Sequence, residues 1–394
     1  MNGQDYRTRI VGRLAGVPER DWDALIDPEA PGAVFVSHAW LGALEASGCV
    51  GPGTGWRPQH VLISDDAGGL VGAAPLYRKT HSYGEYVFDW AWADAYQRHG
   101  LDYYPKLVCA VPFTPVQGPR LLGPTPGARR VAARELLRHA VGANVSSLHV
   151  LFPDTPADEA LAPAGLMRRT GVQFQWRNAG YRDFDDFLAA LTQPKRKKIR
   201  AERRKAAGAG IRCRRLLGEQ IDESHWRFFH ACYCSTYAAH HSTPYLNLEF
   251  FLRIGKSLSD HCVMVVAERN GSPTAASLLI KDRTRLYGRY WGAVEPIAFQ
   301  HFEVAYYQAI ETAIELGLQT IEGGAQGEHK MARGFEPVET GSWHWLAEPA
   351  FADAVERYLA REGQMMSGYL DELDDRSPYR ANAVTTPPPT RDTD

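Results

Sequence analysis

The sequence lacks several features that would each point to a particular class of protein. It has no run of about 20 consecutive apolar residues that would cross a bilayer, and its N-terminus lacks the apolar core of a signal peptide. Its six cysteines are scattered without paired CxxC motifs, which disfavours a disulfide framework and favours a reducing compartment. HExxH and GxSxG motifs are also absent, so the zinc and serine hydrolases that carry them are not indicated. We therefore expect a cytoplasmic protein with no metal site and no tightly bound cofactor.

An excess of charge of one sign is also missing. The formal net charge is -2, which argues against a protein that coats nucleic acid but leaves room for a local basic site. The chain has 394 residues, of which 44% are hydrophobic, and this length exceeds what one hydrophobic core usually serves. The expected division is a lead-in over 1–34, a first domain over 35–180, a second domain over 181–373 and a disordered, proline-rich tail over 374–394.

Two parts of the chain share one order of predicted elements. In each part a strand, a glycine turn and a small-residue strand are followed by an aromatic strand, a helix, a loop and a further strand. The matched segments are 60–79 with 263–282, 84–94 with 285–295, and 128–152 with 301–324. Such units are common in α/β proteins, which is the alternative explanation. We interpret the match as two similar α/β domains in tandem.

The stretch from Phe299 to Trp345 is where we expect chemistry. Apolar residues recur at helical spacing from Phe299 to Leu316, Gly317 is typical of a helix end, and a short strand is expected over 318–322. The loop GGAQGEHKMARGF follows. Its glycines allow the backbone to approach a ligand closely, and its polar side chains are crowded together.

This loop contains groups suited to N-acyl transfer. That reaction removes a proton from the attacking ammonium and stabilises a tetrahedral oxyanion. Glu328 or His329 is the candidate base, and Lys330 or Arg333 is the candidate for holding the oxyanion or a substrate phosphate. Gln326 is a candidate hydrogen-bond donor. Although His and Glu are adjacent here, no matching metal-ligand spacing exists.

Further candidates lie around the start of the preceding helix. Arg289 and Trp291 are on the strand before it, while His301, Glu303 and Tyr307 fall in its first turns. A carboxylate near a helix N-terminus is stabilised in its charged form, so Glu303 is expected to orient a substrate or to act in catalysis. A capping role is the alternative for this residue.

The segment FDWAWADAYQRHGLDYYPKL is the candidate acceptor pocket of the first domain. A strand is expected over Tyr86–Ala93, and its alternation would place Trp90, Trp92 and Asp94 on one face. An aromatic wall with a carboxylate suits a ligand amine. The alternative is a set of core aromatics beside a structural aspartate. The candidate substrate-binding residues are Asp89, Trp90, Trp92, Asp94, Tyr104 and Lys106.

A basic helix is expected over 195–207, in a chain that is otherwise nearly neutral. Like charges spaced at i, i+4 destabilise a helix, so a phosphate-rich donor would explain their presence. The alternative is a solvated helix face that is compensated by acids elsewhere. The candidate phosphate- or donor-binding residues are Lys195, Arg196, Lys197, Lys198, Arg200 and Arg203.

Several of these stretches resemble one group of proteins. HFEVAYYQAIETAIELGLQTIEGGAQ and PKRKKIRAERRKAAGAGI are similar to patterns in the Fem-like branch of the GNAT acyltransferase superfamily. FDWAWADAYQRHGLDYYPKL and GAQGEHKMARGFEP look like signatures of a bacterial family described as predicted N-acyltransferases, or peptidoglycan-biosynthesis-like proteins. Together the motifs cover most of residues 35–350.

The resemblance implies an α/β fold with two tandem GNAT-like domains, each a mostly antiparallel sheet flanked by helices. It also implies transfer of an acyl or aminoacyl group from an activated donor onto a small-molecule or peptide amine. The loop before the second long helix, AVEPIAFQ, has no glycine run and no basic residue to grip a pyrophosphate, so the donor stays open between charged tRNA and acyl-CoA. An acetyl-CoA-dependent N-acetyltransferase and a non-catalytic module that binds a cell-wall precursor or peptide are the alternatives.

Overall fold

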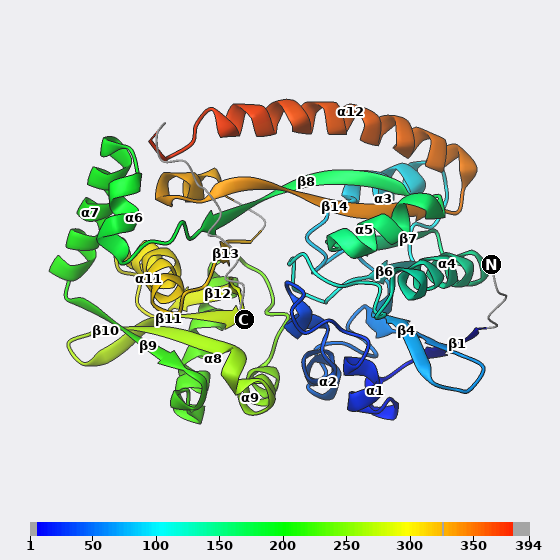
Figure 1. Cartoon of the computed structure of the whole chain (residues 1–394), viewed down its shortest axis with the longest axis horizontal. Helices are drawn as coiled ribbons and strands as arrows, with labels where there is room; N and C mark the ends of the chain where they lie inside the picture. The colour runs from blue at the N-terminus through cyan, green and yellow to red at the C-terminus, as the bar shows by residue number, and fades with distance from the viewer. Residues whose placement is uncertain (1–5, 325–326, 381–394) are drawn as a thin grey trace, which may run out of the picture. The chain divides into compact units, whose positions relative to one another are not determined.

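The computed structural model describes residues 6–324 and 327–380, and the chain divides into two compact units (Figure 1). Unit 1 comprises Met1–Gly171, Tyr245–Ile254 and Glu339–Gly368. Unit 2 comprises Val172–Pro244, Gly255–Val338 and Tyr369–Asp394. The division expected from the sequence stays a prediction about which segments would fold independently.

Unit 1 contains a mixed sheet in the order β2-β5-β6-β7-β14 and a small antiparallel sheet in the order β1-β3-β4. In the mixed sheet only the pair β6–β7 is parallel, and helix α4 connects these two strands along the chain. The strands are β1 (Arg7–Val11), β2 (Trp56–Pro58), β3 (His60–Ser64), β4 (Leu70–Ala74), β5 (Leu76–Lys79), β6 (Lys106–Cys109), β7 (Ser147–Leu151) and β14 (Glu336–Leu346). The helices are α1 (Glu19–Asp23), α2 (His38–Ala46), α3 (Trp90–Arg98), α4 (Pro126–Gly142) and α5 (Thr155–Leu161).

Unit 2 repeats this arrangement with a sheet in the order β8-β13-β12-β11-β10-β9. Only β12 and β13 are parallel, and a long helical segment connects them. The strands are β8 (Met167–Arg177), β9 (Ile211–Leu217), β10 (Cys262–Arg269), β11 (Ser272–Lys281), β12 (Arg285–Ala293) and β13 (Thr320–Glu322). The helices are α6 (Phe184–Ala190), α7 (Gln193–Gly208) and α8 (Glu223–Ala239). Two further helices, α9 (Leu248–Ser257) and α12 (Pro349–Asp374), begin with residues of unit 1 and end with residues of unit 2.

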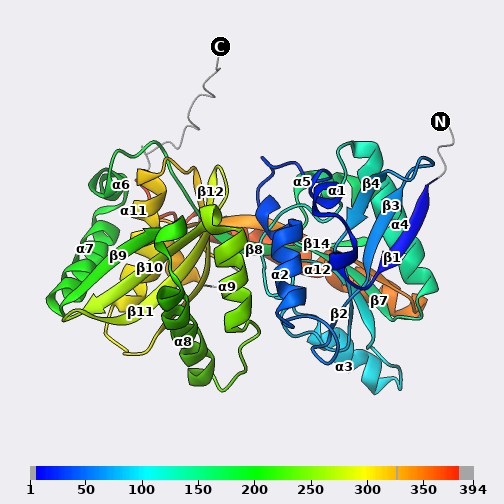
Figure 2. The ribbon, with the colours of Figure 1, turned by 90° about the horizontal axis from the view of Figure 1, so that it is seen from below.

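Glycine allows α8 to pack closely on the sheet of unit 2 (Figure 2). A Cβ atom added at Gly292 of β12 would lie 1.9 Å from the carbonyl oxygen of Cys232, which is on α8. Real Cβ contacts are never that short, so only glycine fits at this crossing. On the sheet, Val265, Leu279 and Leu286 are buried in the core of this unit.

The sequence correctly predicted the helix and the strand that end each copy of the repeat, which are α4 with β7 in unit 1 and the long helical segment with β13 in unit 2. It was wrong about Tyr86–Ala93, because the chain forms helix α3 from Trp90 onward rather than a strand. Trp92 and Tyr96, spaced i, i+4, are the buried residues of that helix, so the period is helical and not alternating. The strand that precedes the connecting helix in unit 1, as β12 does in unit 2, is β6.

The long helix predicted from Phe299 to Leu316 is present but irregular. It consists of α10 (Gln300–Phe302), a π-helical turn (Glu303–Tyr307) and α11 (Gln308–Glu315), and Gly317 follows in the left-handed conformation at φ 66°. The hydroxyl of Ser277 on β11 donates to the carbonyl oxygen of Val304 at 3.1 Å. A carbonyl that bonds outside the helix is a recognised cause of such an irregular turn, and π-turns are frequent at functional sites.

The C-terminal part of the chain differs from the sequence-based expectation. Helix α12 was not predicted, and the segment after it packs rather than leaving the fold, because Tyr379 is buried and its hydroxyl donates to the carbonyl oxygen of Gly334 at 2.7 Å. The rest of the predicted tail, 381–394, lies outside the described residues. In the described part of the chain, no helix combines the length and apolar character needed to span a membrane.

Candidate functional site

A cavity of about 120 Å³ lies in unit 2 where strands β12 and β13 stop pairing. The parallel pairing covers only Arg285–Tyr287 on β12 and Thr320–Glu322 on β13. Beyond it the cavity separates the two strands and reaches the π-helical turn. Its polar and aromatic lining residues are Ser277, Arg289, Tyr290, Trp291, His301, Tyr306, Glu322 and Phe335, and its other lining residues are Leu278, Leu279, Gly288, Ala305, Ile321 and Gly323.

A β-bulge brings the backbone and side chain of Arg289 to the cavity wall. Leu278 pairs with Tyr290 and the next residue, Leu279, pairs with Gly288, so Arg289 is the extra residue on β12. Bulges redirect side chains and are common next to active sites. The sequence-predicted residues Arg289 and Trp291 therefore both line the cavity.

Glu322 is the acidic residue of the cavity, and the sequence analysis missed it. Its side chain is buried, with Oε1 accepting hydrogen bonds from Arg285 Nη1 at 2.8 Å and Gln175 Nε2 at 3.4 Å. Oε2 has no hydrogen bond to any described residue. Burial raises the pKa of Glu322 to about 7, although the Arg285 guanidinium opposes this shift. A carboxyl group with a pKa near neutral can accept a proton at physiological pH. The sequence signal for it was an acid directly before a glycine pair at the end of a strand.

Aromatic rings form one wall of the cavity. His301 stacks on Trp291 with ring centroids 4.3 Å apart, and it also contacts Tyr306 at 5.4 Å. Burial lowers the pKa of His301 to about 4, with nearby positive charges adding to the effect. His301 is therefore neutral at physiological pH and available as a hydrogen-bonding group rather than as a cation.

The predicted catalytic loop forms a 3₁₀ turn (Glu328–Arg333) next to the cavity. His329 Nε2 lies 3.1 Å from the hydroxyl of Tyr306, and burial with neighbouring positive charges lowers the pKa of this histidine. Lys330 is buried and donates to the carbonyl oxygen of Gly324 at 3.1 Å. Burial lowers the pKa of Lys330 to about 8. Gln326 and the side chain of Glu328 lie outside the described part of the structure.

Three other predicted residues lie behind this wall and do not line the cavity. Glu303 is held by Arg203 of α7, whose Nη2 lies 2.9 Å from Oε1. Arg333 and Tyr307 both bind Glu202 of α7, a buried residue that the sequence analysis did not single out.

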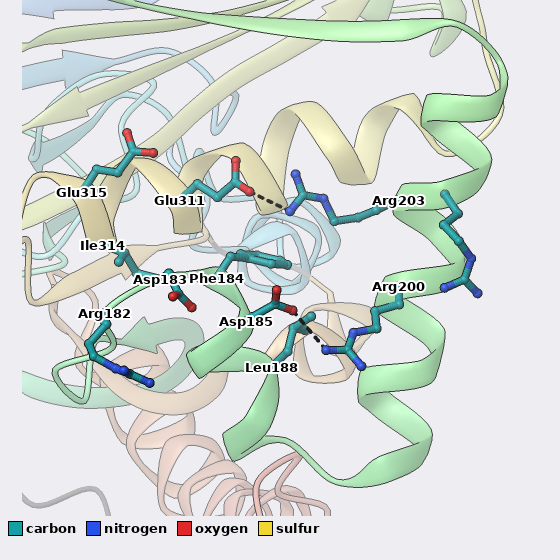
Figure 3. A pocket seen from close by; sticks show the side chains of 11 residues that line it. Arg182, Asp183, Phe184, Asp185, Leu188, Arg200, Arg203, Glu311, Ile314 and Glu315 are labelled. Carbon is teal, nitrogen blue, oxygen red and sulfur yellow. Dashed lines mark hydrogen bonds and ion pairs between the residues drawn. The ribbon is translucent and has the colours of Figure 1, made fainter.

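The basic helix α7 carries two kinds of cation. Lys195, Arg196, Lys197 and Lys198, near its start, form no ion pair with any described residue. Arg200 and Arg203, in contrast, face α6 and α11 and bind Asp185 and Glu311, as Figure 3 shows. These two arginines line a cavity of about 610 Å³ that contains four arginines and four carboxylates. Its balanced charge gives it no preference for phosphate. Of the predicted phosphate-binding residues, only the first four have charges that no described carboxylate compensates.

The predicted residues of unit 1 form a buried polar network instead of an aromatic wall. Lys106 Nζ donates to Ser82 Oγ and Glu85 Oε2, both at 2.8 Å, and also to Asp89. Although burial acts in the opposite direction, the Lys106 ammonium holds the pKa of Asp89 well below its usual range. Tyr104, half-buried, bonds to Ser82 at 2.9 Å.

The remaining predicted residues of this segment separate on helix α3. Trp92 is buried, with its ring centroid 5.0 Å from that of His344. Trp90 and Asp94 are exposed and take no part in the network. The helical period explains this separation, because residues two apart on a helix point in different directions.

Two histidines that the sequence analysis missed continue the network. Tyr103 donates to Asp89 Oδ2 at 2.6 Å and lies 3.2 Å from His149 Nε2. His149 Nδ1 lies 2.7 Å from Nδ1 of His344, so one ring must donate to the other. Ser342 is 2.8 Å from the far nitrogen of His344. Within residues 6–324 and 327–380, no group of three His, Cys, Asp or Glu side chains has the arrangement of a metal site.

The fold is shared with solved structures of low sequence identity. FemX is 12% identical with a TM-score of 0.54, and the match covers 89% of this chain and 100% of that chain. The C-terminal domain of a putative lysylphosphatidylglycerol synthetase from Agrobacterium fabrum is 11% identical with a TM-score of 0.52, covering 87% and 95%. A conserved protein from Bacteroides thetaiotaomicron is 10% identical with a TM-score of 0.51, covering 86% and 99%. The predicted α/β class, with mostly antiparallel sheets flanked by helices, is thereby confirmed.

No curated protein matches the chain by sequence. The model of one protein family matches the chain over residues 13–381, which is nearly its whole length. The chain belongs to the FemAB-like family, which is described as peptidoglycan biosynthesis/recognition.

Proposed function

We propose that the protein is an N-acyltransferase that moves an acyl or aminoacyl group from an activated ester or thioester onto an amine, in the cavity of unit 2. The observation that carries the proposal is Glu322, a buried carboxyl group with a pKa of about 7 at the cavity between β12 and β13. Membership of the FemAB-like family supports the same class of reaction.

Glu322 supplies the base. An amine is protonated at neutral pH and cannot attack until the ammonium loses a proton. In the proposed step, Glu322 Oε2 takes that proton while Arg285 and Gln175 hold Oε1. The amine nitrogen then bonds to the carbonyl carbon, and the carbon–oxygen or carbon–sulfur bond to the leaving group breaks. The leaving group departs with the electron pair and takes up the second proton, which the nitrogen loses as the amide forms.

The cavity favours attack of the amine on the carbonyl carbon by orienting the donor and the acceptor. At about 120 Å³ it is smaller than the 300–1,000 Å³ typical of small-molecule sites. It therefore admits only the reacting ends of donor and acceptor, which is what catalysis by proximity requires. Arg289 at the wall and Lys330 beside Gly323 are the cations proposed to stabilise the developing oxyanion, whereas Arg333 is already engaged by Glu202.

The first part of α7 is the proposed contact for the donor's phosphates. Lys195, Arg196, Lys197 and Lys198 are not neutralised by any described carboxylate. Both charged tRNA and acyl-CoA carry phosphates, so this surface suits either donor. We propose a primary amine on a small molecule or peptide as the acceptor.

The test is turnover by the full chain and by Glu322→Gln, with acetyl-CoA and with lysyl-tRNA as donors and a panel of primary amines. Products are identified by mass spectrometry. We expect transfer from at least one donor, rising with pH through about 7 as Glu322 ionises. Glu322→Gln should lower kcat by about 100-fold or more and remove that pH dependence.

The matched control is Glu268→Gln, which removes a charge from an ion pair with Arg214 outside the cavity. Unchanged kcat in Glu322→Gln would refute the role of Glu322. Transfer from acetyl-CoA alone would identify an N-acetyltransferase. No transfer from either donor to any amine would overturn the enzyme proposal and favour a binding module.

A further inference from the structure

Arg333 occupies an unusual position for a charged side chain. It is 2% exposed, and its guanidinium carbon lies 3.5 Å from the ring centroid of Phe302. Nη2 donates to both carboxylate oxygens of Glu202, at 2.9 and 3.0 Å, and Nη1 donates to the carbonyl oxygen of His329 at 2.7 Å. One planar group thus joins helix α7 to the backbone of the 3₁₀ turn.

Glu202 is the partner on α7. It lies on the buried side of the helix with Ile199 and Ala206, and it accepts a further hydrogen bond from the hydroxyl of Tyr307. Burying two charges is unfavourable unless each is paired and hydrogen-bonded. The three hydrogen bonds that Glu202 accepts and the ion pair it forms meet this requirement.

The 3₁₀ turn that Glu202 and Arg333 hold supports one wall of the cavity. Arg333 fixes the backbone of His329, and the ring of His329 lies 3.1 Å from the Tyr306 hydroxyl. Tyr306 lines the cavity and contacts His301. A continuous set of contacts therefore leads from Glu202 on α7 to the cavity opposite Glu322.

Besides Arg333, the buried side chains of Lys330 and Met331 hold the turn. The Tyr379 hydroxyl donates to the carbonyl oxygen of Gly334 at its end. The turn is bounded by Gly327 at φ 115° and Gly334 at φ 91°, which are conformations that favour glycine. Glycine at both ends makes the unfolded turn more flexible and its ordering more costly in entropy. Contacts from outside the turn must supply the order.

We infer that Glu202 and Arg333 are positioning residues, which hold the turn 328–333 so that His329 and Tyr306 are correctly placed at the cavity. The inference rests on the proposed function for its effect on turnover, but not for its effect on the turn. Neither residue touches the cavity, so each acts through another side chain.

The test uses the full chain with Arg333→Met, Arg333→Lys, Tyr307→Phe and, as a control, Glu268→Gln. Amide hydrogen exchange at residues 329–334, the NMR titration of His329 and turnover are measured. Arg333→Met keeps an apolar side chain over Phe302 but loses the hydrogen bonds to Glu202 and to the carbonyl oxygen of His329. Arg333→Lys keeps the charge without the planar fork, and Tyr307→Phe removes one hydrogen bond while leaving the ion pair.

We expect exchange in the turn to rise about tenfold or more in Arg333→Met and Arg333→Lys, and less in Tyr307→Phe, while strand β10 is unaffected. Loss of the positive charge in Arg333→Met should raise the pKa of His329, because Arg333 now contributes to lowering it. Arg333→Lys should not rescue kcat. Glu268→Gln should change none of these quantities.

Unchanged exchange in the turn in every variant that folds would overturn the inference, so Tyr307→Phe still decides it if the Arg333 variants fail to fold. Faster exchange with unchanged kcat and KM would reduce the pair to a structural role and also overturn it. If the wild-type chain shows no transfer at all, the proposed function fails by itself, while exchange and the His329 titration still decide whether the pair holds the turn.

Discussion

At the scale of single residues, the candidate site is made of charges that burial disfavours. Glu322 and Lys330 lie on either side of Gly323, and burial shifts the pKa of each toward its neutral form. A Cβ atom at Gly323 would be 3.2 Å from Lys330 Cδ, so the lysine side chain lies directly against this part of the cavity wall. Groups of this kind reduce stability and are retained where they serve a function.

Lys330→Met should therefore stabilise the protein at neutral pH. The lysine pKa falls from 10.5 to about 8, and this corresponds to about 3 kcal/mol of unfavourable burial of the charge. Loss of the hydrogen bond to Gly324 offsets about 1 kcal/mol, which leaves a net gain of about 2 kcal/mol. Because the pKa is lowered on folding, the gain is full below pH 8 and fades as the pH rises toward 10.5. Urea denaturation at pH 7 and pH 10 measures it.

Turnover of the same variant shows whether Lys330 acts in transfer as well as lowering stability. A stabilised variant with lower kcat indicates that the lysine acts in transfer, whereas a stabilised variant with normal kcat indicates that it does not. A variant that is destabilised at pH 7 would contradict the description of Lys330 as a buried lysine whose charge is unfavourable.

At the scale of elements, helix α7 has its charges at the wrong end for stability. Lys195 and Arg196 lie in its first turn, where the helix dipole favours acids. The N-cap residue Thr192 accepts no hydrogen bond through its side chain. An arrangement that is locally unfavourable on two counts is consistent with selection for binding an anion.

Lys195→Glu should stabilise the protein and weaken its binding to polyanions. The change removes a cation from the first turn and creates Thr-x-x-Glu, the sequence of a capping box, so we expect a gain of about 0.5–1 kcal/mol. Binding of a bulk tRNA mixture, measured by fluorescence anisotropy at two salt concentrations, should fall several-fold with a shallower salt dependence. Thermal unfolding and anisotropy are read on the same samples.

Lys256→Glu is the matched control, since it makes the same charge change in the last turn of α9. There the dipole favours a cation, so stability should fall slightly while binding stays the same. Equal loss of binding in both variants would show that only net charge matters, and this outcome would contradict a specific role for α7.

At the scale of the whole molecule, the two units use the same sheet pattern for different purposes. In unit 2 the parallel pair β12–β13 opens onto a cavity. In unit 1 the parallel pair β6–β7 carries the buried network of Lys106 and His149, which is closed by side-chain hydrogen bonds. The sequence repeat is therefore structural, and the chemistry that we propose is confined to the second copy.

The histidine pair of unit 1 makes stability depend on pH. Burial lowers the pKa of His149 to about 3 and that of His344 well below its usual value, so both stay neutral in the folded chain where the unfolded chain takes up protons. The contribution of the pair to stability should be constant above about pH 6.5 and fall below it, by up to about 2.7 kcal/mol per pH unit for two protons. Glu322, whose raised pKa makes the folded chain take up a proton between about pH 7 and 4.5, opposes about half of that slope. Urea denaturation between pH 7.5 and 4.5 measures the slope.

His344→Gln should reduce that slope by about one proton, whatever its effect on stability at pH 7. His240→Gln, at an exposed position just after α8, should leave the slope unchanged. A slope that is the same in wild type and His344→Gln would contradict a neutral, buried pair.

The sequence alone determined the elements with strong local signals. The helix from Glu223 to Ala239, the hairpin of β10 and β11, and the stop at Gly317 follow from periodicity, turn residues and glycine, all of which act over a few residues. The crowded loop after β13 was also visible, because its composition is unusual. The strand predicted over Tyr86–Ala93 was wrong because the sequence WAWAD fits both an alternating strand and the i, i+4 period of a helix.

Only the tertiary structure decided which charges are buried and which are compensated. Glu322 reads as an ordinary acid at a strand end until Arg285 and Gln175, from strands on either side, enclose it. Arg203 and Arg333 read as phosphate ligands until their acidic partners on distant segments are known. A pKa depends on the groups within a few ångströms and on the exclusion of water, and long-range packing alone sets both.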